Sequence, residues 1–239
     1  SRGLGDVYKR QELERVSASS VIHYHANIHK ALKYAVKLDL ISSNPADKIE
    51  RPKKERFMAN FYDADEVNRL FEISKGTKLE IPILFGAFYG MRRSETLGMK
   101  WDAIDFERDT ITIRHTLTTV ALDGKRITVA EDRTKNKSSM RTLPLVPFVK
   151  ERLLELKAEQ EENRRLCGRS YVKDYTGYVC INEIGDIIKP NYVSCGFPKL
   201  LEEHGLRRVR YHDLRHSCAS LLLANGVPMK QIQEWLGHS

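Results

Sequence analysis

Basic side chains near the C-terminal end of the chain recur at a spacing that suits phosphate chemistry. His212 and Arg215 lie on one face of a helix if residues 212–224 are helical. A second short helix is predicted after Val227-Pro228, and it ends at Gly237, directly before His238. Arginine binds two phosphate oxygens at once and stays protonated, and histidine exchanges protons near neutral pH. The set predicts a site for a phosphate group.

Another arginine follows a glycine in the first half of the chain. Residues 90–95 read GMRRSE, and Gly90 is expected to end an apolar core helix over residues 81–89. A new helix is expected to begin near Ser94. Such a junction can aim the Arg92 guanidinium into a pocket while packing holds its stem. The alternative for Arg92 is an ordinary salt bridge, with Glu95 as the nearest acid.

Residues 90–95, 212–215 and 236–238 together resemble the active-site motifs of the tyrosine recombinases, the integrases of phages and transposons. Each short motif alone often arises by chance, but the combination with an intervening apolar helix is much rarer. The chain has Tyr89 where the family pattern has Thr. The resemblance implies site-specific DNA recombination through a 3′-phosphotyrosyl intermediate, without ATP, metal or other cofactor.

The resemblance also implies a role for each basic residue of the site. Arg92 and Arg215 would hold the non-bridging oxygens of the scissile phosphate. His212 would hydrogen-bond the phosphate or carry the proton of the nucleophile. His238 would steady the phosphate or the nucleophile.

A basic hairpin turn over residues 134–141 would supply the acid for the leaving oxygen. Lys135 matches the family position best, and Lys137 is its rival because one-residue slips in such turns are easy. Lys137 and Arg141 are also expected to contact DNA. Two acidic residues, Glu95 and Asp213, are expected to support the site.

The nucleophilic tyrosine of the family lies beyond the motif at residues 236–238, past Ser239. None of the ten tyrosines of the chain matches that position. Tyr211 neighbours His212 but is expected to point elsewhere. We therefore expect the full-length protein to recombine DNA and this 239-residue fragment to bind DNA without cutting it.

Composition agrees with a nucleic-acid partner. The net charge is +8, and the hydrophobic content of 41% is ample for a core. The four cysteines show no C-x-x-C spacing, which predicts free thiols in a reducing compartment. No membrane-spanning run or signal peptide is visible. We expect a cytoplasmic, nucleoid-associated bacterial or phage protein.

The partners follow from the resemblance. Double-stranded DNA is the substrate, and self-association into a tetramer on DNA is expected. Accessory DNA-bending proteins are further candidates, and no membrane partner is expected. Within the family, a mobile-element integrase fits the motifs better than a chromosome-dimer resolvase.

The pattern predicts an α+β fold that is mainly α. Residues 1–11 resemble a translated cloning adapter, and residues 12–55 resemble the end of a helical core-binding domain. Residues 56–239 would form a C-terminally truncated catalytic domain. Helices are expected at 18–40, capped by Ser19 or Ser20, from Asp63 with Glu66 completing a capping box, at 147–165 and from 190 to about 204. Strands at 111–115, 126–129 and 141–145 would form a three-stranded antiparallel sheet.

Three other functions remain open at this stage. A type IB topoisomerase uses similar chemistry without strand exchange. A DNA-binding module could keep the pocket and lack the nucleophile. A metal-dependent nuclease could use histidines such as His25 and His29, but no carboxylate or cysteine is expected near them to complete a ligand set.

Overall fold

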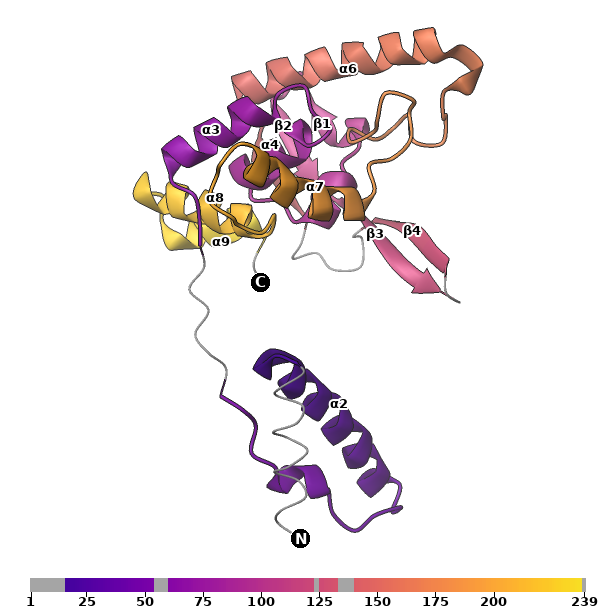
Figure 1. Ribbon diagram of the computed structural model, residues 1–239, viewed down its shortest axis with the longest axis vertical. Coiled ribbons are helices and arrows are strands. Elements are labelled where there is room, and N and C mark those ends of the chain that lie inside the picture. The colour runs from indigo at the N-terminus through magenta and orange to yellow at the C-terminus, as the bar shows by residue number, and fades with distance from the viewer. Residues whose placement is uncertain (1–15, 54–59, 123–124, 133–139, 238–239) are drawn as a thin grey trace. The chain divides into compact units, whose positions relative to one another are not determined.

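The computed structural model describes residues 16–53, 60–122, 125–132 and 140–237 (Figure 1). Contacts divide the chain into two compact units, residues 1–58 and 59–239, and each is described by itself. None of the described helices combines the length and apolar character that crossing a bilayer requires.

The first unit consists of helix α2 (Ala18–Lys37) and a short 3₁₀ helix, η1 (Pro45–Lys48). The N-cap of α2 is Ser17, whose hydroxyl accepts a hydrogen bond from the Ser20 amide, so the expected caps Ser19 and Ser20 were wrong. Ser17 has the extended backbone that an N-cap needs, whereas residues 19 and 20 already belong to the helix. No residue of α2 is buried.

The two histidines of α2 contact the segment that follows it. His25 Nε2 lies 3.1 Å from the Ala46 carbonyl, and His29 Nε2 lies 2.6 Å from a carboxylate oxygen of Asp47. The turn at residues 38–44 thus folds Asp47 back onto the helix. Within the described ranges, no group of three or more metal-ligating side chains is assembled.

The second unit is α+β and mainly helical, as expected. Its helices are α3 (Ala64–Ser74), α4 (Glu80–Phe88), α5 (Arg93–Leu97), η2 (Trp101–Ala103), α6 (Pro147–Cys167), η4 (Gly168–Ser170), α7 (Pro190–Glu203), α8 (Asp213–Ala224) and α9 (Met229–Leu236). Its strands are β1 (Ile104–Asp105), β2 (Thr110–Ile113), β3 (His115–Leu122), β4 (Lys125–Asp132) and β5 (Arg141–Pro144). The capping box of Asp63 and Glu66 at α3 is confirmed.

A three-stranded antiparallel sheet is present, but one of its strands differs from the prediction. Its order is β1-β2-β5, and β3 and β4 form a separate two-stranded ribbon. The Asp105 carboxylate accepts the amides of Glu107 and Arg108, and this tight turn lays β1 onto β2. The predicted strand at residues 126–129 pairs with β3 instead. The predicted turn at Asp123-Gly124 lies outside the described residues.

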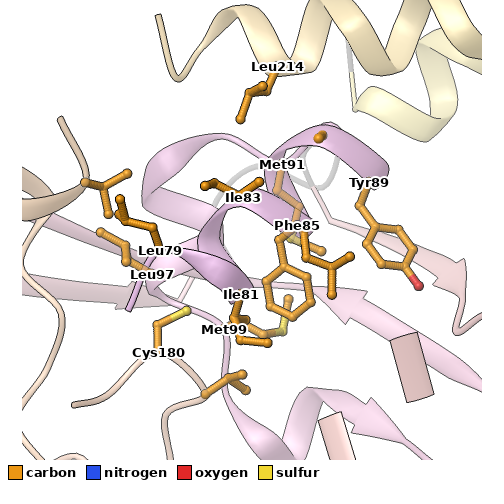
Figure 2. Close-up of a cluster of buried hydrophobic side chains, with 14 of the residues drawn as sticks. Leu79, Ile81, Ile83, Phe85, Tyr89, Met91, Leu97, Met99, Cys180 and Leu214 are labelled. Atoms are coloured by element: carbon orange, nitrogen blue, oxygen red, sulfur yellow. The ribbon is translucent and has the colours of Figure 1, made fainter. Parts of the chain in front are cut away.

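Helix α4 forms the centre of the core. Its sequence is apolar on all sides, and all its residues except Phe88 are buried. Figure 2 shows Ile81, Ile83 and Phe85 of this helix among side chains from other elements, including Met99, Cys180 and Leu214. Helix α8 packs directly against α4, which brings the C-terminal motif next to the junction after α4.

Helix α8 is buried only in its first half. Leu214, Arg215 and Cys218 are buried, whereas Leu223 is 52% exposed. Leu221 and Leu222 are partly buried, Leu221 against the main core and Leu222 against the small apolar cluster shared with α9. Helix α8 ends at Ala224, and Gly226, directly after its C-cap Asn225, has a left-handed backbone with a φ of 76°.

Candidate active site

The turn between α4 and α5 positions Arg92. Gly90 has a φ of 62°, which ends α4, and its Cα faces Leu236 of α9 so closely that a Cβ would collide with Leu236 Cδ2. Arg92 is the N-cap of α5. Its amide donates to Glu95 Oε2 at 2.9 Å, and its Nη1 donates to Glu95 Oε1 at 2.8 Å. The Arg92 side chain keeps 32% of its surface exposed.

Glu95 is fully buried and holds two arginines. Arg141 Nη2 donates to Glu95 Oε2 at 3.0 Å, alongside the two hydrogen bonds from Arg92. Burial alone would raise the pKa of the Glu95 carboxyl, but the charges and hydrogen bonds of Arg141 and Arg92 outweigh it and hold the pKa below its ordinary value. Glu95 is therefore ionised near neutral pH. The salt bridge between Arg92 and Glu95, the alternative for Arg92, does form. It is part of a cluster that consists of Glu95, Arg92 and Arg141.

Arg215 enters the same cluster from α8. Its side chain is buried, and its Nη1 and Nη2 donate to the carbonyls of Gly90 at 2.7 Å and Leu236 at 2.5 Å. Burial and the positive charges of Arg92 and Arg141 lower the pKa of the Arg215 guanidinium to about 10. It still carries its charge at neutral pH. The structure thus brings Arg92 and Arg215 together, as the sequence predicted.

The start of α8 presents His212 and anchors Asp213. Asp213 is buried, and its carboxylate accepts from the amide and the guanidinium of Arg210 at 2.8 Å each. Burial raises the pKa of the Asp213 carboxyl, but Arg210 reverses the effect and the pKa is lowered. His212 is exposed, and desolvation together with the charges of His216 and Arg215 lowers its pKa. Its imidazole is therefore neutral at pH 7.

Two neighbours of the site escaped the sequence reasoning. The His216 ring stands perpendicular to His212, with ring centroids 5.7 Å apart. The Arg210–Asp213 pair fixes the entry into α8. Both are detectable from helical spacing, since His216 is four positions after His212 and Arg210 is three before Asp213.

Three predicted residues lie outside the described part of the chain: Lys135, Lys137 and His238. Their neighbours are described. Arg141 begins β5, directly after the predicted basic turn, and Gly237 ends α9 with a φ of 66°. Arg141, expected to contact DNA, is buried and directed at Glu95. Its guanidinium is thus occupied by the Glu95 carboxylate and packed against the backbone at Gly237.

Three tyrosine hydroxyls near the site are already engaged in the core. Tyr211 donates to the Pro82 carbonyl at 2.5 Å, Tyr89 to that of Pro144 at 3.1 Å, and Tyr62 to that of Arg207 at 2.5 Å. Burial raises the pKa of Tyr89 and Tyr62 to about 12 each. Tyr211 does point away from the arginines, as expected. All four cysteines are free thiols, which confirms that prediction.

The mainly helical second unit thus brings Arg92, Arg141 and Arg215, from three distant segments, close to the buried carboxylate of Glu95. Residues 60–239 match the phage integrase family, and the chain belongs to this family. The family expected from the motifs is thereby confirmed.

The sequence relatives include a tyrosine recombinase XerC-like protein of Caldanaerobacter subterraneus subsp. tengcongensis. It is 31% identical over 205 residues, which cover 84% of this chain and 51% of that protein. A tyrosine recombinase XerA of Thermococcus onnurineus is 30% identical over 200 residues, covering 81% of this chain and 59% of that protein. The chain thus spans little more than half of the length of these two relatives.

Solved structures share the fold. The Tn1549 transposon integrase in complex with a circular intermediate DNA matches with a TM-score of 0.78 and 19% identity, covering 98% of this chain and 76% of that one. A lambda integrase dimer bound to a core site matches with a TM-score of 0.67 and 16% identity, covering 98% and 75%.

Proposed function

We propose that this chain carries the phosphate-binding part of a tyrosine recombinase that breaks and rejoins DNA at specific sites. The observation that carries the proposal is the cluster of Arg92 and Arg215 around Glu95, built from segments far apart in the chain. The family match and the recombinase relatives support it. The first unit would be the end of the core-binding domain (residues 12–55), and residues 56–239 would belong to the catalytic domain.

The arginines would stabilise the charge that develops on the phosphate during attack. Each guanidinium presents parallel N–H donors that match two phosphate oxygens. Both are held in place before DNA arrives, Arg92 by Glu95 and Arg215 by two backbone carbonyls. Donors fixed in this way need little reorganisation during the reaction, and one such donor commonly contributes about 3 kcal/mol to catalysis.

Residues near Arg92 and Arg215 would carry out the proton transfers. A neutral His212 can accept the proton of the nucleophile or hydrogen-bond a phosphate oxygen, and its lowered pKa fits that role. Lys135, or Lys137 as its rival, would donate a proton to the leaving 5′ oxygen, and His238 would steady the phosphate. Asp213 would fix the start of α8 and thereby the direction of His212.

The nucleophile would be a tyrosine that the chain's folded core does not offer. Tyr62, Tyr89 and Tyr211 are each committed to a backbone carbonyl. The attack would join the tyrosine oxygen to phosphorus and release the 5′ hydroxyl. The 3′-phosphotyrosyl bond would then preserve the energy needed to rejoin a new strand.

The proposed partners are duplex DNA and further copies of the chain. A lambda integrase tetramer bound to a Holliday junction shares the fold with a TM-score of 0.65, which supports assembly on DNA. Action on bacterial or phage DNA in the cytoplasm, association with the nucleoid, and help from accessory DNA-bending proteins complete the proposal. A mobile-element integrase remains our proposal for the subclass, supported by the motifs.

The test is covalent capture on DNA. A recognition site is first selected from random duplexes by binding to this chain, and binding should weaken steeply with salt. The full-length protein is then given a nicked duplex of that site. A protein–DNA adduct should form in the presence of EDTA. Cleavage that requires a metal and leaves no adduct would favour a nuclease. Relaxation of a supercoiled plasmid that carries the site, without strand exchange, would favour a topoisomerase, and binding without cleavage a DNA-binding module.

Single substitutions link the adduct to the cluster. Arg92→Ala and Arg215→Ala should each lower the rate of adduct formation by about 100-fold or more. Arg164→Ala is the matched control, because Arg164 is an exposed arginine on α6 whose partner Glu161 is also exposed. Wild-type rates in either cluster variant would contradict the proposed roles.

A further inference from the structure

We propose that Arg141 is a positioning residue of the phosphate site, which neutralises Glu95 so that the charge of Arg92 remains available to DNA. This inference rests on the function proposed above. It concerns a residue that the sequence analysis placed at the DNA surface and that the structure places inside the protein.

Among the described residues, Arg92 and Arg141 both bind the Glu95 carboxylate, and they bind it unequally. Arg141 reaches both oxygens, with Nη2 3.0 Å from Oε2 and Nη1 3.5 Å from Oε1. Arg92 contributes one guanidinium hydrogen bond of 2.8 Å and its backbone amide. Arg141 thus approaches the carboxylate with its fork, whereas Arg92 approaches with one end of its guanidinium.

Charge balance explains why a second arginine is useful here. A buried carboxylate paired with Arg92 alone would cancel the charge that the phosphate needs. Arg92, Arg141 and Arg215 carry three positive charges against the single negative charge of Glu95, so the four side chains carry a net charge of +2. A phosphodiester has one negative charge, and the phosphorane formed from it has two. The excess at the site therefore suits the charge that develops during attack.

Arg141 also touches the turn that ends α9. A Cβ on Gly237 would lie 2.9 Å from Arg141 Nη1 and 3.3 Å from its Cδ, so the guanidinium packs against the glycine backbone. The Leu236 carbonyl, one residue earlier, accepts the hydrogen bond of Arg215 Nη2. Arg141 and Arg215 together hold the point at which the chain continues to His238. The Arg141 Nε has no hydrogen-bond partner among the described residues.

This placement makes Arg141 a link between three parts of the site. It lies at the start of β5, a few residues after Lys135 and Lys137 in the sequence, and it contacts α5 through Glu95 and the end of α9 through Gly237. It is not expected to touch the phosphate. Arg141 should affect phosphate binding only by neutralising the charge of Glu95. The effect of replacing Arg141 should therefore depend on whether Glu95 is present, and this dependence can be measured.

The experiment is a double-mutant cycle on the 239-residue chain with tungstate, a tetrahedral dianion, as the probe. Tungstate affinity is measured by calorimetry for wild type, Arg141→Met, Glu95→Gln and the double variant. Arg141→Met should weaken binding about tenfold or more, because Glu95 then neutralises Arg92. The double variant should bind within about threefold of Glu95→Gln, because no carboxylate remains to be neutralised.

Two further variants control for folding and charge. Arg164→Met removes an exposed arginine and should leave the affinity unchanged. Arg141→Lys keeps the charge without the fork, and it should bind more tightly than Arg141→Met. If Arg141→Met does not fold, Arg141→Lys and the double variant replace it: Arg141→Lys should then bind more weakly than wild type, and the double variant should match Glu95→Gln.

The outcomes separate this inference from the proposed function. Arg92→Met tests the function itself and should abolish tungstate binding. If wild type binds no tungstate, or Arg92→Met binds like wild type, both proposals fall. If Arg92→Met loses binding but Arg141→Met does not, or if the Arg141→Met defect persists undiminished in the double variant, only the role of Arg141 is overturned.

Discussion

Arg215 and Gly90 are joined by a hydrogen bond of 2.7 Å from the Arg215 guanidinium to the Gly90 carbonyl, across 125 positions of sequence. Gly90 stands two residues before Arg92. The bond therefore fixes one arginine of the cluster to the turn that carries the other. Any change that shifts this turn should disturb both arginines at once.

Gly90→Ala should show how tightly that turn is packed. Gly90 has a φ of 62° and faces Leu236 at a distance that leaves no room for a Cβ. We expect a loss of about 3 kcal/mol in the free energy of unfolding, from backbone strain and overpacking together. Gly76→Ala is the control, because Gly76 has a φ of 69° but open space around its Cα. It should lose only about 1 kcal/mol in urea denaturation. Equal losses would argue against the close contact with α9.

Glu95→Gln should make the free energy of unfolding less dependent on pH. The folded-state pKa of Glu95 is lowered, so its contribution is complete above the unfolded pKa of about 4.3 and is lost as pH falls through the lower folded value. At pH 7 the variant should be less stable by about 3 kcal/mol, because the buried Arg141 and the partly exposed Arg92 lose their counter-charge. Urea denaturation between pH 7 and pH 3 should show the difference shrinking. A difference that does not change with pH would contradict the ionised state of Glu95.

His212 should titrate below the ordinary histidine value. Desolvation and the nearby charges of His216 and Arg215 disfavour its protonated form. In NMR titrations the midpoint of the His212 ring should lie below 6.5. His216→Ala should move the midpoint upward, since one of the opposing charges is removed. His204→Ala provides the comparison: this histidine contacts the Leu200 carbonyl on α7, and its loss should leave His212 unchanged. A midpoint above 6.5 in the wild type would contradict the neutral imidazole.

Local signals in the sequence accounted for much of the fold. The capping box at Asp63 and Glu66 and the helix end at Gly90 each depend on residues a few positions apart, so the local sequence contains the signal that forms them. The pairing of the strands was harder to predict from the sequence. Strand β1 has only two residues and shows no alternation, and a side-chain turn at Asp105 creates it.

The cluster itself was only partly predictable. Arg92 and Arg215 could be paired because their flanking motifs resemble one family. The environment of Arg141 could not be predicted, because its partner Glu95 lies 46 positions away in the sequence. No local pattern distinguishes a buried arginine from one that faces DNA. Long-range ion pairs of this kind follow from packing, which the sequence alone does not display.

The most direct test of the account is the position of a phosphate-like anion in a crystal of this chain soaked with tungstate. Because tungsten scatters anomalously, its site can be assigned without ambiguity. We expect one tungstate within hydrogen-bond distance of both the Arg92 and the Arg215 guanidinium groups. Tungstate that contacts only one of these arginines, or binds elsewhere on the chain, would contradict the claim that the two close over a single phosphate.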